Sequence, residues 1–208
     1  IQLKTNKRIL RFYSIFTNHI NNKMKVLKFG GTSVGSANAI LKVKKIAESQ
    51  NEPIVVVVSA LSGITDKLYA TSKMVAQGEP YETAFAEIAE KHYHIIGETI
   101  APEKQDAVKR QIGILLDELQ NIFKGVFLIK DISDRIVDTI VSYGERLSSV
   151  IVSQVIEDAF WADSTTFVKT NPQFGKHVVD FNETNQLICK QFANEKRCVV
   201  CVGFISSD

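Results

Sequence analysis

The stretch Val26-Leu-Lys-Phe-Gly-Gly-Thr-Ser33 predicts a strand over residues 26–29 that ends on two glycines and turns into a helix. The glycines carry no side chain, so the backbone there can approach a ligand closely. Thr32 or Ser33 can cap the following helix, whose first N–H groups and positive dipole end attract an anion. Lys28 adds a full positive charge. The stretch therefore predicts a phosphate-binding turn at the edge of a sheet.

Two widespread phosphate-binding motifs do not describe this turn. The P-loop pattern Gly-x-x-x-x-Gly-Lys-Ser/Thr is absent, and Gly30 and Gly31 are adjacent, so Gly-x-Gly-x-x-Gly of the dinucleotide-binding folds is absent too. The alternative interpretation is a tight strand-to-helix turn with Lys28 in solvent. From the residues of this turn alone, phosphate binding and a plain turn are equally good interpretations.

Strand and helix patterns alternate along the rest of the chain. The unbroken run Ile54-Val-Val-Val-Val58 predicts a strand covered on both faces. Apolar residues at helical spacing predict helices over about 39–47, from about 65, over 81 to about 124 with a break at Pro102, over about 136–155 and near 187–192. Further strands are expected at 160–161, 166–168 and 198–202. This order predicts an α/β fold with a mainly parallel sheet sandwiched by helices.

The chain stops shortly after the strand expected at 198–202, and a domain rarely ends on a core-like strand. We therefore expect the fold to be incomplete at the C-terminus, with this last strand left at a sheet edge that lacks its neighbour.

Charge and composition narrow the class of protein. The chain has 208 residues, 45% hydrophobic, which is enough for one sizeable core. Residues 1–23 hold five Lys or Arg and no acid, so residues 24–208 carry 20 basic and 23 acidic side chains. The slight net negative charge of residues 24–208 argues against nucleic-acid binding. No stretch of the sequence has the apolar length of a membrane span. Residues 1–23 lack the apolar region of a signal peptide, so we expect an extension outside the fold and a cytoplasmic protein.

The cysteines and histidines do not predict a metal site. Cys198 and Cys201 are three apart on an expected strand, so they should point to opposite faces and stay free in a reducing cytosol. His92 and His94 should diverge on a helix, as separate core or surface side chains.

Five segments, in order, resemble the aspartate kinases of the amino-acid kinase superfamily. They are Lys28-Phe-Gly-Gly-Thr-Ser-Val34, Val58-Ser-Ala-Leu-Ser-Gly-Ile-Thr65, Ser142-Tyr-Gly-Glu-Arg146, Lys169-Thr-Asn-Pro-Gln-Phe-Gly175 and Gly203-Phe-Ile-Ser-Ser207. Five ordered motifs are far more specific than any one of them. The resemblance implies that residues 24–208 are the N-terminal part of an amino-acid kinase domain.

The resemblance implies transfer of the γ-phosphoryl group of ATP to the β-carboxylate of L-aspartate, giving 4-phospho-L-aspartate for the biosynthesis of lysine, threonine and methionine. Mg²⁺ would bridge the nucleotide phosphates, with no protein ligand implied for it. Lys28 would neutralise charge on the transferring group, with Gly30, Gly31 and Ser33 around the phosphate oxygens. The implied aspartate contacts are Ser59, Ala60, Thr65, Glu145 (to the α-ammonium) and Phe204. The full-length parent is expected to be a homo-oligomer.

The family pattern continues with an Arg-Gly-Gly-Ser-Asp segment that this sequence lacks, so we expect the chain alone not to phosphorylate aspartate. One alternative is another amino-acid kinase, acting on acetylglutamate, glutamate or a nucleotide, although Ser142-Tyr-Gly-Glu145 and the Phe-Gly segment favour aspartate. A second is a non-catalytic module that binds aspartate without turning over ATP. A monofunctional parent and a fusion to a homoserine dehydrogenase both fit the sequence.

Overall fold

A parallel sheet lies at the centre of the computed structural model, which describes residues 24–173 and 176–203. Its order is β1 (Lys25–Phe29), β2 (Ile54–Val58), β6 (Val199–Val202) and β3 (Phe160–Ala162), with every neighbouring pair parallel. This arrangement confirms the expected mainly parallel sheet. A separate antiparallel hairpin is formed by β4 (Thr170–Gln173) and β5 (Lys176–Val179).

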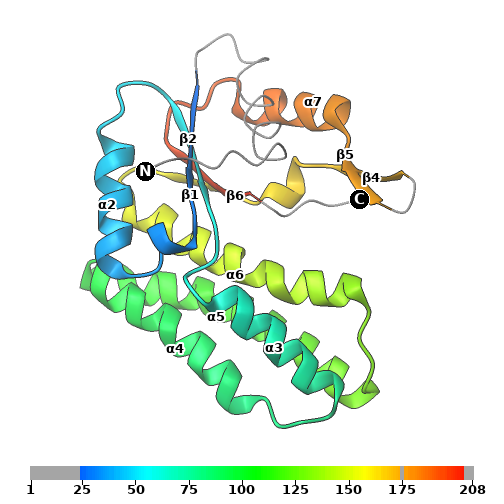
Figure 1. Cartoon of the computed structure of the whole chain (residues 1–208). Helices are drawn as coiled ribbons and strands as arrows, with labels where there is room; N and C mark the ends of the chain where they lie inside the picture. Colours follow the sequence, from blue (N-terminus) through cyan, green and yellow to red (C-terminus); the bar gives the residue numbers. More distant parts are fainter. Residues whose placement is uncertain (1–23, 174–175, 204–208) are drawn as a thin grey trace.

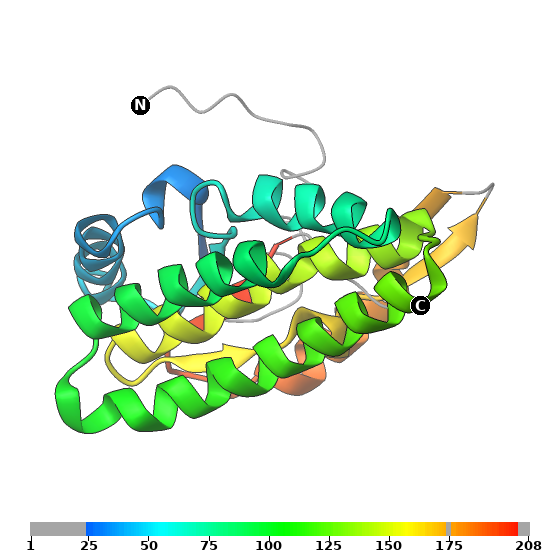
Figure 2. The same ribbon diagram turned by 90° about the horizontal axis from the view of Figure 1, so that it is seen from below.

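Helices cover both faces of the sheet (Figure 1). One face carries α2 (Ala37–Glu48), α3 (Ile64–Ala76), α4 (Glu82–Thr99), α5 (Pro102–Ile129) and α6 (Asp134–Val155). The other face carries α7 (Phe181–Phe192). Figure 2 shows the larger helical layer from its outer side, where α5 lies beside both α4 and α6. The expected sandwich of helices around the sheet is therefore confirmed.

Strand β2 explains why the sheet has a core on each side. All five of its residues are buried, as the unbroken β-branched run predicted. Val56 and Val58 pack into the larger core with α2 to α6, whereas Val55 and Val57 pack into the smaller core with α7. A strand with apolar side chains on both faces needs cover on both faces, which a parallel sheet with helices on each side provides.

The helical stretch predicted over 81 to about 124 divides at its predicted break into α4 and α5, which pack against each other. Pro102 occupies the first turn of α5, where proline costs no internal hydrogen bond. Rings from both helices then pack together, with Tyr81 and Phe123 centroids 5.5 Å apart and Phe85 edge-on to Phe123 at 6.2 Å. Helix α5 continues to Ile129, beyond the end near residue 124 that the sequence indicated.

Two expectations about strands were wrong, and one pair of strands was not predicted. Residues 166–168 are not a strand: a short 3-10 helix, η2 (Ser164–Thr166), precedes Phe167 and Val168, which are apolar because they fill the smaller core. The β4–β5 hairpin was not predicted. Strand β6 is not a sheet edge, because it pairs with β2 on one side and β3 on the other.

His92 is a core histidine, and it predicts a pH dependence of stability. Its Nδ1 lies 2.7 Å from the Ile88 carbonyl oxygen and so donates to it, while Nε2 has no hydrogen-bond partner among the described residues. Burial lowers the pKa of His92 to about 4, against an ordinary value of 6.5. The unfolded chain therefore binds this proton more readily, and stability is lost as pH falls from about 6.5 towards 4.

We expect this effect to lower the free energy of unfolding by about 2 kcal/mol between pH 7 and pH 5. Denaturant unfolding of the wild type, His92→Gln and His94→Gln at both pH values tests it. His94 is exposed beside Glu98, 3.4 Å away, so it is the matched control. The pH-dependent loss should shrink in His92→Gln alone; an equal loss in all three proteins would contradict the assignment.

Candidate functional site

The carboxyl ends of β1, β2 and β6 meet at one edge of the sheet. Phe29 is in register with Val58, and Val58 with Val202. The segments that leave these strands, Gly30-Gly31, Ser59-Ala60 and Gly203, therefore start side by side. The Ser59 N–H donates to the Phe29 carbonyl at 3.1 Å, which joins the first two segments directly. Ligands of open α/β sheets bind at this carboxyl edge.

The two glycines of the first turn serve different purposes. A Cβ added to Gly30 would have no atom of the described residues within 4 Å, so among them its backbone faces open space that a ligand can enter. A Cβ on Gly31 would lie 3.2 Å from the Ala60 carbonyl oxygen, so Gly31 is needed where the two loops touch. The same contact continues at Gly35, whose Cβ would lie 2.8 Å from Ser62 Cβ. The turn is therefore packed against the loop after β2 and open at Gly30.

The helix predicted over about 39–47 forms, but it does not follow the glycine turn directly. A three-residue 3-10 helix, η1 (Gly31–Ser33), comes first, and α2 starts only at Ala37. Its cap is Ser36, whose Oγ accepts from the Ala39 N–H at 3.3 Å. The predicted capping by Thr32 or Ser33 was therefore wrong. Both residues stay in the turn beside Gly30, and Ser33 is only half-buried.

Lys28 places a positively charged side chain near this edge of the sheet. It lies one residue before the end of β1, paired with Val57, and it is exposed. Within the part of the chain that the structure describes, it has neither an ion-pair nor a hydrogen-bond partner. By contrast, Lys25 at the other end of the strand is engaged by Glu52 at 2.6 Å and Gln50 at 2.9 Å. Lys28 therefore keeps its full charge available for an anion.

The loop after β2 is held by two neighbouring helices. Ser148 of α6 donates to the Ser59 carbonyl at 2.7 Å, and Lys91 of α4 donates to the Ser62 carbonyl at 2.5 Å. Gly63 then takes a positive φ of 76°, which favours glycine, at the start of α3. In this loop Ser59 is half-buried, Ala60 is buried, and Thr65 is exposed on the first turn of α3.

Glu145 reaches the same edge from α6. Its carbonyl oxygen lies 3.0 Å from Ser148 Oγ, which also donates to the Ser59 carbonyl, and its side chain is half-buried. The neighbouring Gly144 packs against the loop after β2, because a Cβ there would lie 2.9 Å from Ala60 Cβ and 3.2 Å from Ile64 Cγ2. Gly144 therefore allows the loop after β2 and the start of α3 to approach α6 closely.

Substituting Gly144 is therefore expected to be costly. Gly144→Ala should lower the free energy of unfolding by about 1–2 kcal/mol, because overpacking outweighs a helix-propensity gain of roughly 1 kcal/mol. The control is Gly125→Ala in α5, where an added Cβ meets no other described residue within 4 Å, so the gain should appear alone. Chemical denaturation measures both; stabilisation of Gly144→Ala to the extent of Gly125→Ala would contradict the packing role.

Two other predicted segments can be followed only in part. Phe204 lies outside the described residues, but the strand before it ends in a fixed position: Ser164 Oγ donates to the Val202 carbonyl at 2.6 Å. A Cβ on Gly203 would lie 2.7 Å from Val57 Cγ1, so this position also requires glycine. The segment that begins at Lys169 contains strand β4 of the hairpin, and its last two positions, 174 and 175, lie outside the described residues.

Cys198 and Cys201 point to opposite faces of the sheet, as expected. Cys198 packs with the larger core and Cys201 with the smaller one. Burial raises the pKa of both thiols to about 12, so neither is a ready thiolate. Among the described residues, no group of three or more His, Cys, Asp or Glu side chains is arranged to hold a metal ion.

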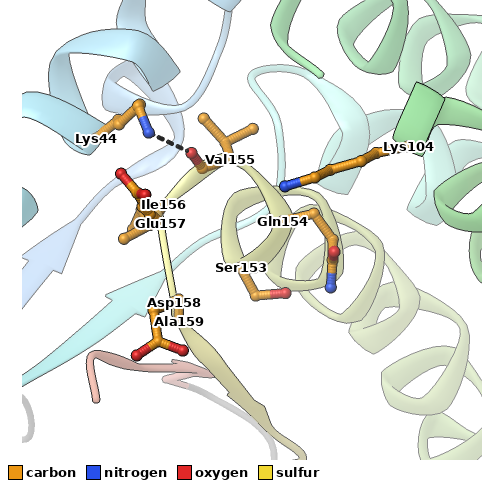
Figure 3. Close-up of a pocket in the computed structure, with 9 residues that line it drawn as sticks. All are labelled: Lys44, Lys104, Ser153, Gln154, Val155, Ile156, Glu157, Asp158 and Ala159. Atoms are coloured by element: carbon orange, nitrogen blue, oxygen red, sulfur yellow. Dashed lines mark hydrogen bonds between the residues drawn. The ribbon is translucent and has the colours of Figure 1, made fainter. Parts of the chain in front are cut away.

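One cavity lies at the other end of the sheet (Figure 3). Its volume is about 330 Å³, and it is lined by Lys44, Lys104, Ser153, Gln154, Val155, Ile156, Glu157, Asp158 and Ala159. Lys44 already bonds the Val155 carbonyl at 2.9 Å and Glu48 at 2.6 Å. This cavity contains none of the site residues that the sequence predicted, and we do not assign the chemistry to it.

Sequence reasoning missed the supporting residues Ser148 and Lys91. Ser148 follows Gly144 by four residues, so it lies on the same face of α6, and that spacing was a usable signal. Lys91 is one lysine of a long amphipathic helix, and nothing in the local sequence distinguishes it.

The fold and the five ordered segments define the class of protein: the chain belongs to the amino acid kinase family, whose profile matches residues 23–208. Within that family it is similar to aspartokinases. It is 28% identical to lysine-sensitive aspartokinase 3 of Escherichia coli over 90% of this chain and 42% of that protein. It is 29% identical to the bifunctional aspartokinase/homoserine dehydrogenase of Daucus carota over 86% of this chain and 20% of that protein.

Solved structures agree with these relatives. Escherichia coli aspartokinase III in complex with aspartate and ADP superposes with a TM-score of 0.77 at 28% identity, covering 89% of this chain and 42% of that one. The resemblance to aspartate kinases is therefore confirmed. The chain spans about a fifth to two fifths of the length of these curated relatives. No helix in the described ranges is both long and apolar enough to cross a membrane.

Proposed function

We propose that the protein containing this chain is an aspartate kinase, and that the chain supplies the phosphoryl-transfer lysine and the aspartate-binding half of the active site. One observation carries the proposal: the glycine turn with Lys28, the loop after β2 and the Glu145 segment of α6 meet at the same carboxyl edge of the sheet. Similarity to a structure that contains aspartate and ADP supports this assignment.

The reaction needs positioning more than acid–base chemistry. An oxygen of the β-carboxylate attacks the γ-phosphorus of ATP, a new O–P bond forms, the bond to the β–γ bridging oxygen breaks, and ADP leaves. The carboxylate is ionised at neutral pH, so no base has to remove a proton. Phosphoryl transfer is accelerated mainly by alignment and by stabilisation of charge on the transferring group.

The residues of the edge divide into two proposed groups. Lys28 neutralises charge on the γ-phosphoryl group, while the open backbone at Gly30, with Gly31 and Ser33 beside it, surrounds phosphate oxygens. The open space at Gly30 fits such a group. Mg²⁺ would arrive bound to the nucleotide, where it neutralises phosphate charge.

The second group binds aspartate. Glu145 pairs with the α-ammonium, and the proposed further contacts are Ser59, Ala60, Thr65 and Phe204. The half-buried position of Glu145 favours such a role, since a charge-assisted bond strengthens away from bulk water. We further propose that the full-length protein is a homo-oligomer and is located in the cytoplasm. Residues 1–23 are proposed to form an extension outside the fold.

A substrate panel tests the proposal. The protein expressed from the whole coding sequence is incubated with MgATP and L-aspartate, L-glutamate or N-acetyl-L-glutamate, and ADP release is followed. Hydroxylamine is added in parallel to trap an acyl phosphate as its hydroxamate. We expect ADP release and hydroxamate formation with L-aspartate and with neither of the other two amino acids. Turnover of a glutamate substrate would favour another amino-acid kinase, and aspartate binding without ADP release would favour a binding module.

A further inference from the structure

A single serine hydroxyl in α6 joins the two segments that carry the proposed aspartate contacts. Ser148 Oγ lies 2.7 Å from the Ser59 carbonyl oxygen and 3.0 Å from the Glu145 carbonyl oxygen. One hydroxyl proton can be shared between two such acceptors. The Ser148 side chain has 0% exposure, so water does not compete for these bonds.

A second contact acts from the same face of α6. Gly144 precedes Ser148 by four residues, one helical turn, and its missing side chain lets α6 pack onto Ala60. The Gly144 contact sets how closely the helix approaches the loop after β2. The Ser148 hydrogen bond sets where along the helix the Ser59 carbonyl is held. Together they fix the position of Glu145 relative to Ser59 and Ala60.

We propose that Ser148 is a positioning residue for aspartate, one that holds the Glu145 carboxylate and the Ser59-Ala60 segment at the separation that the amino acid spans. This inference rests on the proposed function. Ser148 itself touches no substrate, because its hydroxyl is buried against two carbonyls. Its removal should therefore weaken aspartate binding while leaving the nucleotide side of the edge intact.

The chain provides a matched control in the same helix. Ser153 is also buried, at 3% exposure, but its hydroxyl returns to the Val150 carbonyl at 2.7 Å inside α6. Ser148→Ala and Ser153→Ala thus remove the same group from similarly buried positions of one helix. Only the first removes a bond to the loop after β2.

The test is steady-state kinetics of the full-length protein. In Ser148→Ala we expect the KM for aspartate to rise about fivefold to tenfold, with the KM for ATP unchanged within about twofold. Ser153→Ala should keep both values. Ser148→Cys, a weak donor, should fall between the wild type and Ser148→Ala, and it supplies the test if the alanine variant is poorly folded.

A purely structural role for Ser148 gives a different result. Loss of correctly folded enzyme lowers kcat but leaves both KM values unchanged, and that outcome overturns the inference. A similar rise in the aspartate KM of Ser153→Ala also overturns it. Failure of the wild type to bind aspartate by calorimetry or to turn it over is distinct from both, because it removes the proposed function itself.

Discussion

Lys28→Ala is expected to lower kcat by about a hundredfold or more, with a much smaller effect on the KM for aspartate. Lys28 stands at the end of β1 beside the open turn, and it has no partner among the described residues. In the proposed role, its charge acts on the phosphoryl group, where negative charge is redistributed in the transition state. An interaction that strengthens in the transition state appears in kcat rather than in KM.

Lys25→Ala is the control for this substitution. Lys25 lies on the same strand and is exposed, but it stands at the opposite end and pairs with Glu52. Its replacement should leave kcat within about twofold, since surface ion pairs contribute little. ADP release under saturating ATP and aspartate measures both variants. A kcat for Lys28→Ala equal to that of Lys25→Ala would remove Lys28 from the chemistry.

Glu145→Gln is expected to raise the KM for aspartate by about tenfold or more while changing kcat less. The substitution keeps the size of the side chain and removes the charge that would pair with the α-ammonium. Charge-assisted bonds of this kind contribute about 1.5–3 kcal/mol, and the pair would exist before the chemical step.

Asp138→Asn gives the matched control for Glu145, because Asp138 is an exposed carboxylate of the same helix. Its aspartate KM should match the wild type. Calorimetric titration with aspartate supplies the same comparison without catalysis. If Glu145→Gln binds aspartate as tightly as Asp138→Asn does, Glu145 lies outside the substrate site.

Local patterns predicted the elements of this fold well where apolar residues alone determine them. The five buried residues of β2 and the proline that opens α5 are examples, because burial on two faces and the missing N–H of proline leave direct traces in the sequence. The β4–β5 hairpin has no such trace. Its first strand, Thr-Asn-Pro-Gln, shows neither alternation nor β-branched enrichment.

The strand order could not be predicted, because it depends on pairing between distant segments. Strand β6 enters between β2 and β3, far from both in sequence, and so becomes an inner strand rather than an edge. The same long-range packing decided the role of Gly144. A glycine inside a helix signals close approach, but only the structure shows that Ala60 and Ile64 are what approach it.

The prediction of the candidate site depended more on the resemblance of its motifs to a known family than on the physical properties of the individual residues. The glycine turn alone fitted a plain turn equally well, and the order of the five segments decided between the two. The structure adds the contacts among them, such as the Gly31 approach to the Ala60 carbonyl and the Ser148 bond to the Ser59 carbonyl. These contacts join residues distant in sequence, which is why no local pattern contains them.

The most direct test of the proposed site is a crystal structure of the full-length protein with L-aspartate and ADP. We expect the α-ammonium of aspartate within about 3 Å of a Glu145 carboxylate oxygen, in the range of charge-assisted hydrogen bonds. The nucleotide phosphates should lie over Gly30 and face Lys28. Two results would contradict the account. One is aspartate bound in the cavity lined by Lys44 and Gln154, at the opposite end of the sheet. The other is a nucleotide that binds elsewhere and leaves the edge at Lys28 empty.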